Sequence, residues 1–169
     1  NLNDIAKDHP DIVTDIAEKW MRSASPQRQK LIRHACRTLI KQGNQKVLKI
    51  FGYEPANIQP VTTTISTPSV VFGDALKFSI TIVSKSSQPQ ALMIDYVIHH
   101  QKANGQTSPK VFKWRIKSLL PNAPLKLIKK HRIKPITTRK YYPGLHKVEV
   151  MINGVSVSTA DFQLQMPAD

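Results

Sequence analysis

In the first third of the chain, apolar side chains recur at the spacing of helices. One face lies between residues 10 and 21: Ile12, Val13, Ile16, Ala17, Trp20 and Met21. A second lies between residues 26 and 42: Leu31, Ile32, Ala35, Cys36, Leu39 and Ile40. Asp8 with Pro10, and Ser25 with Pro26, supply the cap and first-turn residues of these two helices. Gly43 ends the second helix.

Shorter helical segments flank this pair. Leu2, Ile5 and Ala6 are spaced as one helical face, and residues 45–51 form a further short helix that Gly52 ends. Two helices joined by a tight turn have the size of one HEAT-like repeat. A single repeat cannot bury both of its faces, so we expect neighbouring repeats ahead of Asn1, in a longer protein.

After residues 54–60, a linker punctuated by prolines, the hydrophobic period changes from that of helices to two. Alternation of apolar and polar positions, with turn residues between the runs, marks strands. The expected strands lie near residues 61–66, 76–82, 92–98, 112–116, 125–133, 148–152 and 155–166. Asn153-Gly154 separates the last two and is a strong hairpin signal.

About seven short strands are typical of an immunoglobulin-like β-sandwich. Tyr141 precedes the penultimate strand, where such sandwiches place a tyrosine corner. The predicted fold is therefore an α+β, multidomain one: an N-terminal α-helical HEAT-like repeat piece (1–53), a linker (54–60) and an all-β immunoglobulin-like sandwich (61–169). Trp20 and Trp114 are expected in the two cores.

Composition limits the function. The 169 residues include 25 Lys and Arg against 11 Asp and Glu, a net charge of +14, which indicates a polyanionic partner. The single cysteine, Cys36, excludes an internal disulfide and a Cys-based zinc site, and it suits a reducing, cytoplasmic location. No apolar run reaches the roughly 18–20 residues that span a bilayer, so no membrane partner is expected.

The charge is concentrated in the β half. Residues 1–55 carry ten Lys and Arg against six acids, and residues 56–169 carry fifteen against five. Between Lys110 and Lys147 there are twelve basic residues and no acid. The alternation predicts one basic face for Lys113, Arg115 and Lys117, opposite the apolar side chains of that strand. The next strand and loop add further candidate contacts to a polyanion such as a nucleic-acid backbone: Lys129, Lys130, Arg132, Lys134, Arg139 and Lys140.

The helical half contributes a basic stripe. Arg33, Arg37 and Lys41 recur at every fourth position, and Arg28 and Lys30 lie beside them. A row of phosphate contacts is one interpretation of this stripe, and an ordinary solvated helix face is the other. The same alternatives apply to the basic strands, although a field of one sign repels itself without a counterion.

Three segments resemble one family. They are residues 1–10 (NLNDIAKDHP), residues 32–41 (IRHACRTLIK) and residues 134–144 (KPITTRKYYPG), the last followed by His146. Together they resemble the C-terminal part of AlkC-type DNA glycosylases, HEAT-like repeat enzymes of bacterial DNA alkylation repair. The resemblance implies a last helical repeat followed by an immunoglobulin-like domain, across essentially the whole chain.

The resemblance also implies hydrolysis of the N-glycosidic bond of cationic alkylated bases, such as 3-methyladenine and 3-methylcytosine, without flipping the base into a pocket. A positively charged base is already a good leaving group, so a carboxylate that stabilises the sugar cation and orients water is sufficient. Asp4, within the matching first segment, is the candidate catalytic residue, and the alternative for it is a surface or capping acid. The family's other catalytic acids would lie upstream.

The expected partner is thus duplex DNA containing alkylated bases, bound by a monomer without cofactor. We expect no metal site, because His99, His100 and His131 lack partners at metal-ligand spacing. Two other functions remain open. One is that of a non-catalytic module that binds nucleic acid. The other is binding of the basic strands to an anionic membrane or a heparin-like polymer.

Overall fold

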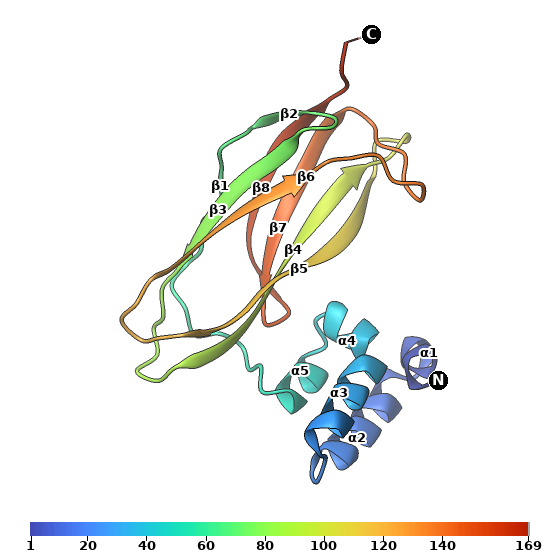
Figure 1. Ribbon diagram of the computed structural model, residues 1–169, viewed down its shortest axis with the longest axis vertical. Coiled ribbons are helices and arrows are strands. Elements are labelled where there is room, and N and C mark those ends of the chain that lie inside the picture. The colour runs from blue at the N-terminus through green and yellow to red at the C-terminus, as the bar shows by residue number, and fades with distance from the viewer. Residues whose placement is uncertain (169) are drawn as a thin grey trace.

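The computed structural model describes residues 1–168, which form a helical part and a β-sandwich lying end to end (Figure 1). The helices are α1 (Leu2–Asp8), α2 (Pro10–Met21), α3 (Pro26–Ala35), α4 (Arg37–Lys41) and α5 (Gln45–Ile50). Pro10 and Pro26 lie in first turns, and the Ser25 hydroxyl accepts a hydrogen bond from Arg28 N, as the sequence predicts. The cap of α2 is His9 and not Asp8, which is the last residue of α1.

The prediction of one long helix between residues 26 and 42 is wrong in one respect, because the helix breaks at Cys36. The bond that would continue the helix, from Thr38 N to the carbonyl of His34, is not made. Thr38 N instead donates to Asn3 Oδ1 at 3.1 Å, and Arg37 Nη1 donates to the His34 carbonyl at 2.9 Å. Thr38 N and the His34 carbonyl therefore both keep a hydrogen-bond partner at the break.

The helical core contains Val13, Ala17, Ile32 and Leu39, together with Met93 from the sandwich. Trp20 was expected there and lies outside it, with 43% of its surface exposed. The reason is the choice of face on α2. Val13 and Ala17 pack inward, whereas Ile12 and Trp20 lie on the exposed side, and the Arg28 guanidinium covers the Trp20 ring at 5.9 Å.

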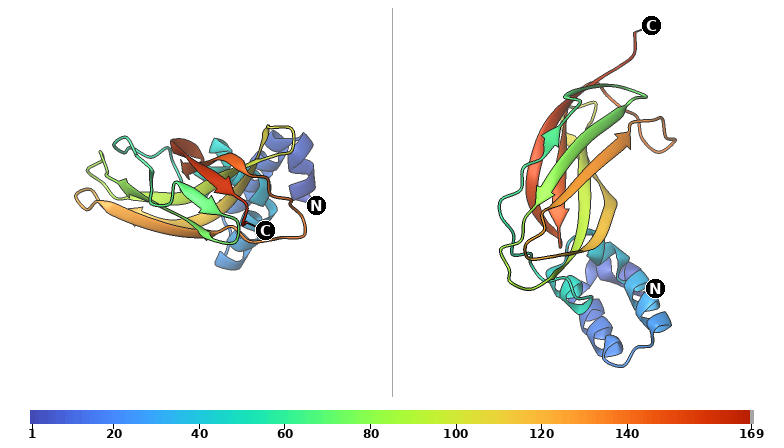
Figure 2. Two further views of the ribbon diagram at one scale, coloured as in Figure 1. Left: turned by 90° about the horizontal axis from the view of Figure 1, so that it is seen from above. Right: turned by 60° about the vertical axis from the view of Figure 1, so that its left-hand side comes forward.

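The sandwich has a three-stranded sheet, in the order β1-β3-β6, and a five-stranded sheet, in the order β2-β8-β7-β4-β5 (Figures 1 and 2). The strands are β1 (Thr64–Ile65), β2 (Ser69–Val71), β3 (Ala75–Ile82), β4 (Gln90–Gln101), β5 (Thr107–Leu119), β6 (Leu125–Arg132), β7 (Gly144–Ile152) and β8 (Val155–Gln165). The sequence prediction missed β2, which pairs parallel to β8 and is only three residues long.

Alternating side chains of the two sheets fill the space between them, as in other sandwiches. Phe78, Tyr96 and Trp114 meet edge to face with ring centroids 5.2–5.9 Å apart, so Trp114 packs at the core as predicted. Tyr141 lies against Phe72 and His100 through its ring. Among residues 1–168 its hydroxyl does not make the backbone hydrogen bond that defines a tyrosine corner.

The turn between β7 and β8 joins the sandwich to the helices. Asn153 is 1% exposed and adopts a φ of 49°. Its amide nitrogen donates to the carbonyls of Glu54 and Ala91, and its amide oxygen accepts from Met93 N at 2.7 Å. Gln45 Nε2, at the start of α5, donates to the Asn153 carbonyl at 3.0 Å. The hairpin turn is therefore also the contact that fixes the two parts together.

We expect Gly154→Ala to destabilise the chain more than an ordinary glycine substitution. Gly154 has a φ of +76°, and an added Cβ would lie 2.6 Å from Leu48 Cδ1 and 2.8 Å from Gly43 Cα. The backbone conformation costs about 1–2 kcal/mol, and the clash adds about 1–3 kcal/mol. Gly105→Ala is the control, because its φ is +79° but an added Cβ meets nothing within 4 Å. Equal losses in free energy of unfolding, measured by urea denaturation, would contradict this account.

Candidate nucleic-acid interface

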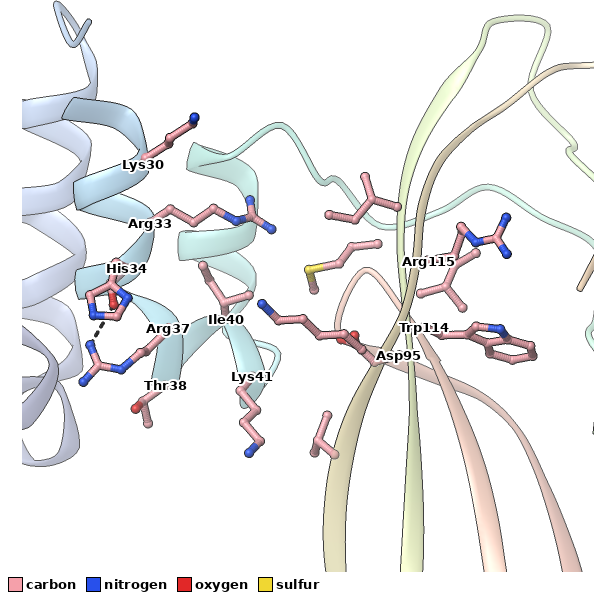
Figure 3. A pocket seen from close by; sticks show the side chains of 15 residues that line it. Lys30, Arg33, His34, Arg37, Thr38, Ile40, Lys41, Asp95, Trp114 and Arg115 are labelled. Atoms are coloured by element: carbon pink, nitrogen blue, oxygen red, sulfur yellow. Dashed lines mark hydrogen bonds between the residues drawn. The ribbon is translucent and has the colours of Figure 1, made fainter. Parts of the chain in front are cut away.

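A cleft of about 770 Å³ opens between the helices and the sandwich (Figure 3). Its helical wall consists of Lys30, Arg33, His34, Arg37, Thr38, Ile40 and Lys41. Its sandwich wall consists of Met93, Ile94, Asp95, Val111, Lys113, Trp114, Arg115 and Ile116. Two segments that the sequence singled out separately, the helical stripe and the first basic strand, thus face one space.

The stripe survives the break at Cys36. Arg33, on α3, and Arg37 and Lys41, on α4, all line the cleft. Aromatic rings hold the end of the Arg33 side chain, since its guanidinium lies 5.5 Å from the Phe51 ring and 5.7 Å from the Tyr53 ring. Arg37 is held by its bond to the His34 carbonyl. Two of the cations are therefore oriented before any ligand binds.

On the sandwich side, the prediction of one face for Lys113, Arg115 and Lys117 is wrong. The pairing of β4 with β5 shifts by one residue at Trp114, so Lys113 pairs with Asp95 but Arg115 pairs with Ile94. Lys117 likewise pairs with Leu92, a core residue. Directly paired residues share a face, so the bulge separates Lys113 from the other two. Figure 3 shows Arg115 beside Trp114, pointing away from the helices.

The remaining predicted contacts lie elsewhere. Lys129 and Lys130 are on β6, where the Lys129 ammonium group lies 5.7 Å from the Tyr96 ring, and Arg132 donates to the Gly73 carbonyl. The loop after β6 carries Lys134, Arg139 and Lys140 at the end of the sandwich away from the helices (Figures 1 and 2). Arg28, on α3, lies beside Trp20 of α2. The structure therefore divides the predicted basic residues among separate surfaces.

Asp4, the catalytic candidate, is exposed in the first turn of α1 and is not among the residues that line the cleft. The acid that does line it is Asp95, which sequence analysis did not select. Asp95 is 8% exposed, and burial raises the pKa of its carboxyl while Lys113 and Arg33 act to lower it. The signal available in the sequence was its position as the last acid before the acid-free stretch.

The loop that carries Arg139 packs over buried histidines. His100 is 3% exposed, and neither of its ring nitrogens has a partner among residues 1–168. His146 accepts a hydrogen bond from Gln101 N, and His131 Nδ1 lies 2.7 Å from the Tyr96 hydroxyl. Burial lowers the pKa of His100 to about 3 and of His131 to about 4, and nearby cations act in the same direction. These histidines are neutral packing groups.

Among residues 1–168, no group of three or more His, Cys, Asp or Glu side chains could hold a metal ion. Within the same residues, no helix is long and apolar enough to cross a bilayer.

Comparison with known proteins identifies the family. A family described as "Uncharacterised protein YhaZ, C-terminal Ig-like domain" matches residues 59–166. The chain belongs to the YhaZ family. YhaZ of Bacillus subtilis strain 168 is 38% identical over 165 residues, which cover 97% of this chain and 45% of YhaZ. The chain thus spans about half the length of the curated relative that it matches.

Almost the entire length of this member of the YhaZ family resembles part of one solved structure. It is the alkylpurine DNA glycosylase AlkC of Pseudomonas fluorescens, bound to DNA containing an abasic site analog. It is 36% identical, with a TM-score of 0.88, over 97% of this chain and 46% of AlkC. A β-glucosidase of Listeria innocua shares only the fold, at 15% identity and a TM-score of 0.52, over 68% of this chain and 17% of the enzyme.

We expect the histidine cluster to make the chain less stable in acid. The folded-state pKa values of His100 and His131 lie below their ordinary 6.5, so the unfolded chain binds protons that the folded chain does not. Stability is then fully present above about pH 6.5 and falls as the pH drops toward about 4 and 3. His100→Phe should make this fall shallower, measured as Tm between pH 7 and pH 4. His9→Phe, an exposed control, should not change the slope.

Proposed function

We propose that this chain is the C-terminal portion of a DNA glycosylase of alkylation repair, and that it binds duplex DNA through the phosphate backbone. The observation that carries the proposal is the cleft, where Lys and Arg from the helices and from the sandwich line one space. AlkC, which is similar across the same two parts, is a DNA glycosylase bound to DNA. In this proposal the five helices are the last HEAT-like repeat of a longer helical domain.

The size of the cleft favours a sugar–phosphate backbone over a whole duplex. A volume of about 770 Å³ is that of a typical small-ligand site. A DNA duplex, whose major groove alone is about 12 Å wide, is too large to enter such a space. The helical stripe and Lys113 would bind one strand from two sides. The cations of β6 and of the following loop would meet more distant phosphates, or remain in solvent.

The proposed reaction is hydrolysis of the N-glycosidic bond of cationic alkylated bases such as 3-methyladenine and 3-methylcytosine, without base flipping. A carboxylate that stabilises the sugar cation and orients water would suffice, because the base leaves without a general acid. Asp4 remains the candidate within this chain. Its exposure leaves it accessible to DNA or to a preceding helical repeat. The proposed enzyme acts as a monomer and uses no cofactor.

The alternative is a non-catalytic module that only binds nucleic acid. Asp4 favours it, because the candidate carboxylate stands outside the cleft. The two functions differ in one measurement, which is release of alkylated base by the complete protein. Release would support the glycosylase, and salt-dependent DNA binding without release would support the module.

We expect Arg33→Ala combined with Arg37→Ala to weaken duplex binding for all sequences. The slope of log affinity against log salt should become shallower by about 0.9 for each lost phosphate contact. Lys19→Ala with Arg22→Ala is the matched control, because it removes the same charge from exposed positions of α2 and its C-cap, outside the cleft. Fluorescence anisotropy with a 20-mer duplex measures both. Equal weakening by the two double variants would show that net charge, and not the cleft, binds DNA.

For catalysis, Asp4→Asn in the complete protein should slow single-turnover excision of a 3-methylated base by about 100-fold or more, because the charge that stabilises the sugar cation is lost. DNA affinity should stay within about two-fold, since the substitution is isosteric and removes a negative charge. Asp8→Asn, at the other end of α1, is the control and should retain the excision rate. An unchanged rate for Asp4→Asn would exclude Asp4 from the reaction.

A further inference from the structure

The cleft contains one carboxylate within a cationic surface. Six Lys and Arg residues line it, of which Arg115 points away from the helices (Figure 3), and Asp95 is the one acid among the lining residues that the structure describes. Asp95 lies on β4, in a run of buried residues, and only 8% of its surface is exposed. Burying a carboxylate is costly unless a nearby charge or hydrogen bond compensates. Its position therefore has to be explained by the groups that face it.

Two cations from different parts of the fold compensate Asp95. Lys113 is its cross-strand partner on β5, so the two side chains lie on the same face of the sheet. Arg33, on α3, lines the same cleft with its guanidinium packed on the Phe51 and Tyr53 rings, and its positive charge acts on the Asp95 carboxylate across the cleft. Both lower the pKa of Asp95 against the effect of burial. The carboxylate thus attracts one cation from each wall of the cleft.

Neither cation forms an ion pair at contact distance with Asp95. Within residues 1–168, the ion pairs at contact distance are Arg22–Glu18, Lys46–Asp11, Lys49–Glu54 and His99–Glu149, and Asp95 is in none of them. Arg33 and Lys113 therefore keep donors free for an external anion. Without Asp95 the repulsion between these two like charges would not be compensated by a negative charge.

We propose that Asp95 is a positioning residue, which holds Arg33 of the helices and Lys113 of the sandwich so that both donate to the same backbone phosphate. The inference rests on the proposed function, because it assigns a phosphate subsite within the proposed DNA cleft. It makes an unusual claim about charge. Removing a negative charge from the cleft weakens the binding of a polyanion, whereas simple charge counting requires the opposite.

The test compares Asp95→Asn with Asp161→Asn in duplex binding. Asp161 is the matched control, because it also faces a lysine across neighbouring strands of the five-stranded sheet, Lys147, but lies outside the cleft. Each variant raises the net charge by one. Asp95→Asn should weaken binding about 5-fold or more, while Asp161→Asn should leave it unchanged or slightly tighter. Equal or tighter binding by Asp95→Asn would overturn the proposal.

A double-mutant cycle separates positioning from general stability. Lys113→Ala should weaken binding clearly in the wild-type chain and much less in the Asp95→Asn chain, because the lysine no longer reaches the phosphate there. Additive losses would mean that Asp95 acts only on the fold. Should Asp95→Asn fail to fold, Asp95→Glu serves alone. It keeps the charge but displaces it by one methylene, so weaker binding supports positioning and wild-type binding overturns it.

These outcomes stay distinct from failure of the proposed function. If the wild-type chain does not bind duplex DNA in a salt-dependent way, the proposed function fails, and the role of Asp95 fails with it. If the wild-type chain binds and the cycle is additive, only the role of Asp95 fails.

Discussion

The rest of the structure depends on the burial of the Asn153-Gly154 turn. The amide of Asn153 replaces solvent for three backbone groups, those of Met93, Ala91 and Glu54. Close approach of Gly154 to Gly43 then lets the turn seat directly on the helices. A hairpin turn usually only reverses the chain, but this one also forms the contact between the helical part and the sandwich. The relative position of the cleft walls follows from it, since one wall belongs to the helices and the other to the sandwich.

The sequence was sufficient for features set by local pattern. Period-two alternation locates the longer strands, and the Asn-Gly pair locates the hairpin, because the required positive φ leaves few other residues. The helices in the first third follow from their caps and apolar faces. The apolar residues of α2 form one face in the sequence pattern, but the structure buries only the side with Val13 and Ala17 and leaves Ile12 and Trp20 exposed. The pattern does not show which part of that wide face packs inward, so it misplaces Trp20.

Features decided by contacts between distant residues could not be predicted. The break at Cys36 arises when Asn3, 35 residues away, takes the amide of Thr38. The bulge at Trp114 arises from pairing with β4, and it moves Arg115 and Lys117 off the face of Lys113. Composition and spacing identify the basic residues, but their division among a cleft, a strand and a loop depends on the topology of the fold.

Asp95 shows a similar limit. In the sequence it is one acid in an alternating strand, where it reads as a residue of the solvated face. In the fold that face is turned toward the helices, so the same residue lines the cleft together with Arg33 and Lys113. The importance of a charged side chain thus depends on what the other domain places over it, which local pattern does not contain.

The hydrogen bond from Thr38 to Asn3 has a mechanical consequence. It couples the first turn of α1 to the cleft wall, because the His34 carbonyl, which does not accept from Thr38 N, accepts a hydrogen bond from the Arg37 guanidinium. The aim of a cation on α4 is therefore set by an uncharged amide that does not touch the cleft. Scanning only the charged residues of such a surface would overlook the side chain that points one of them.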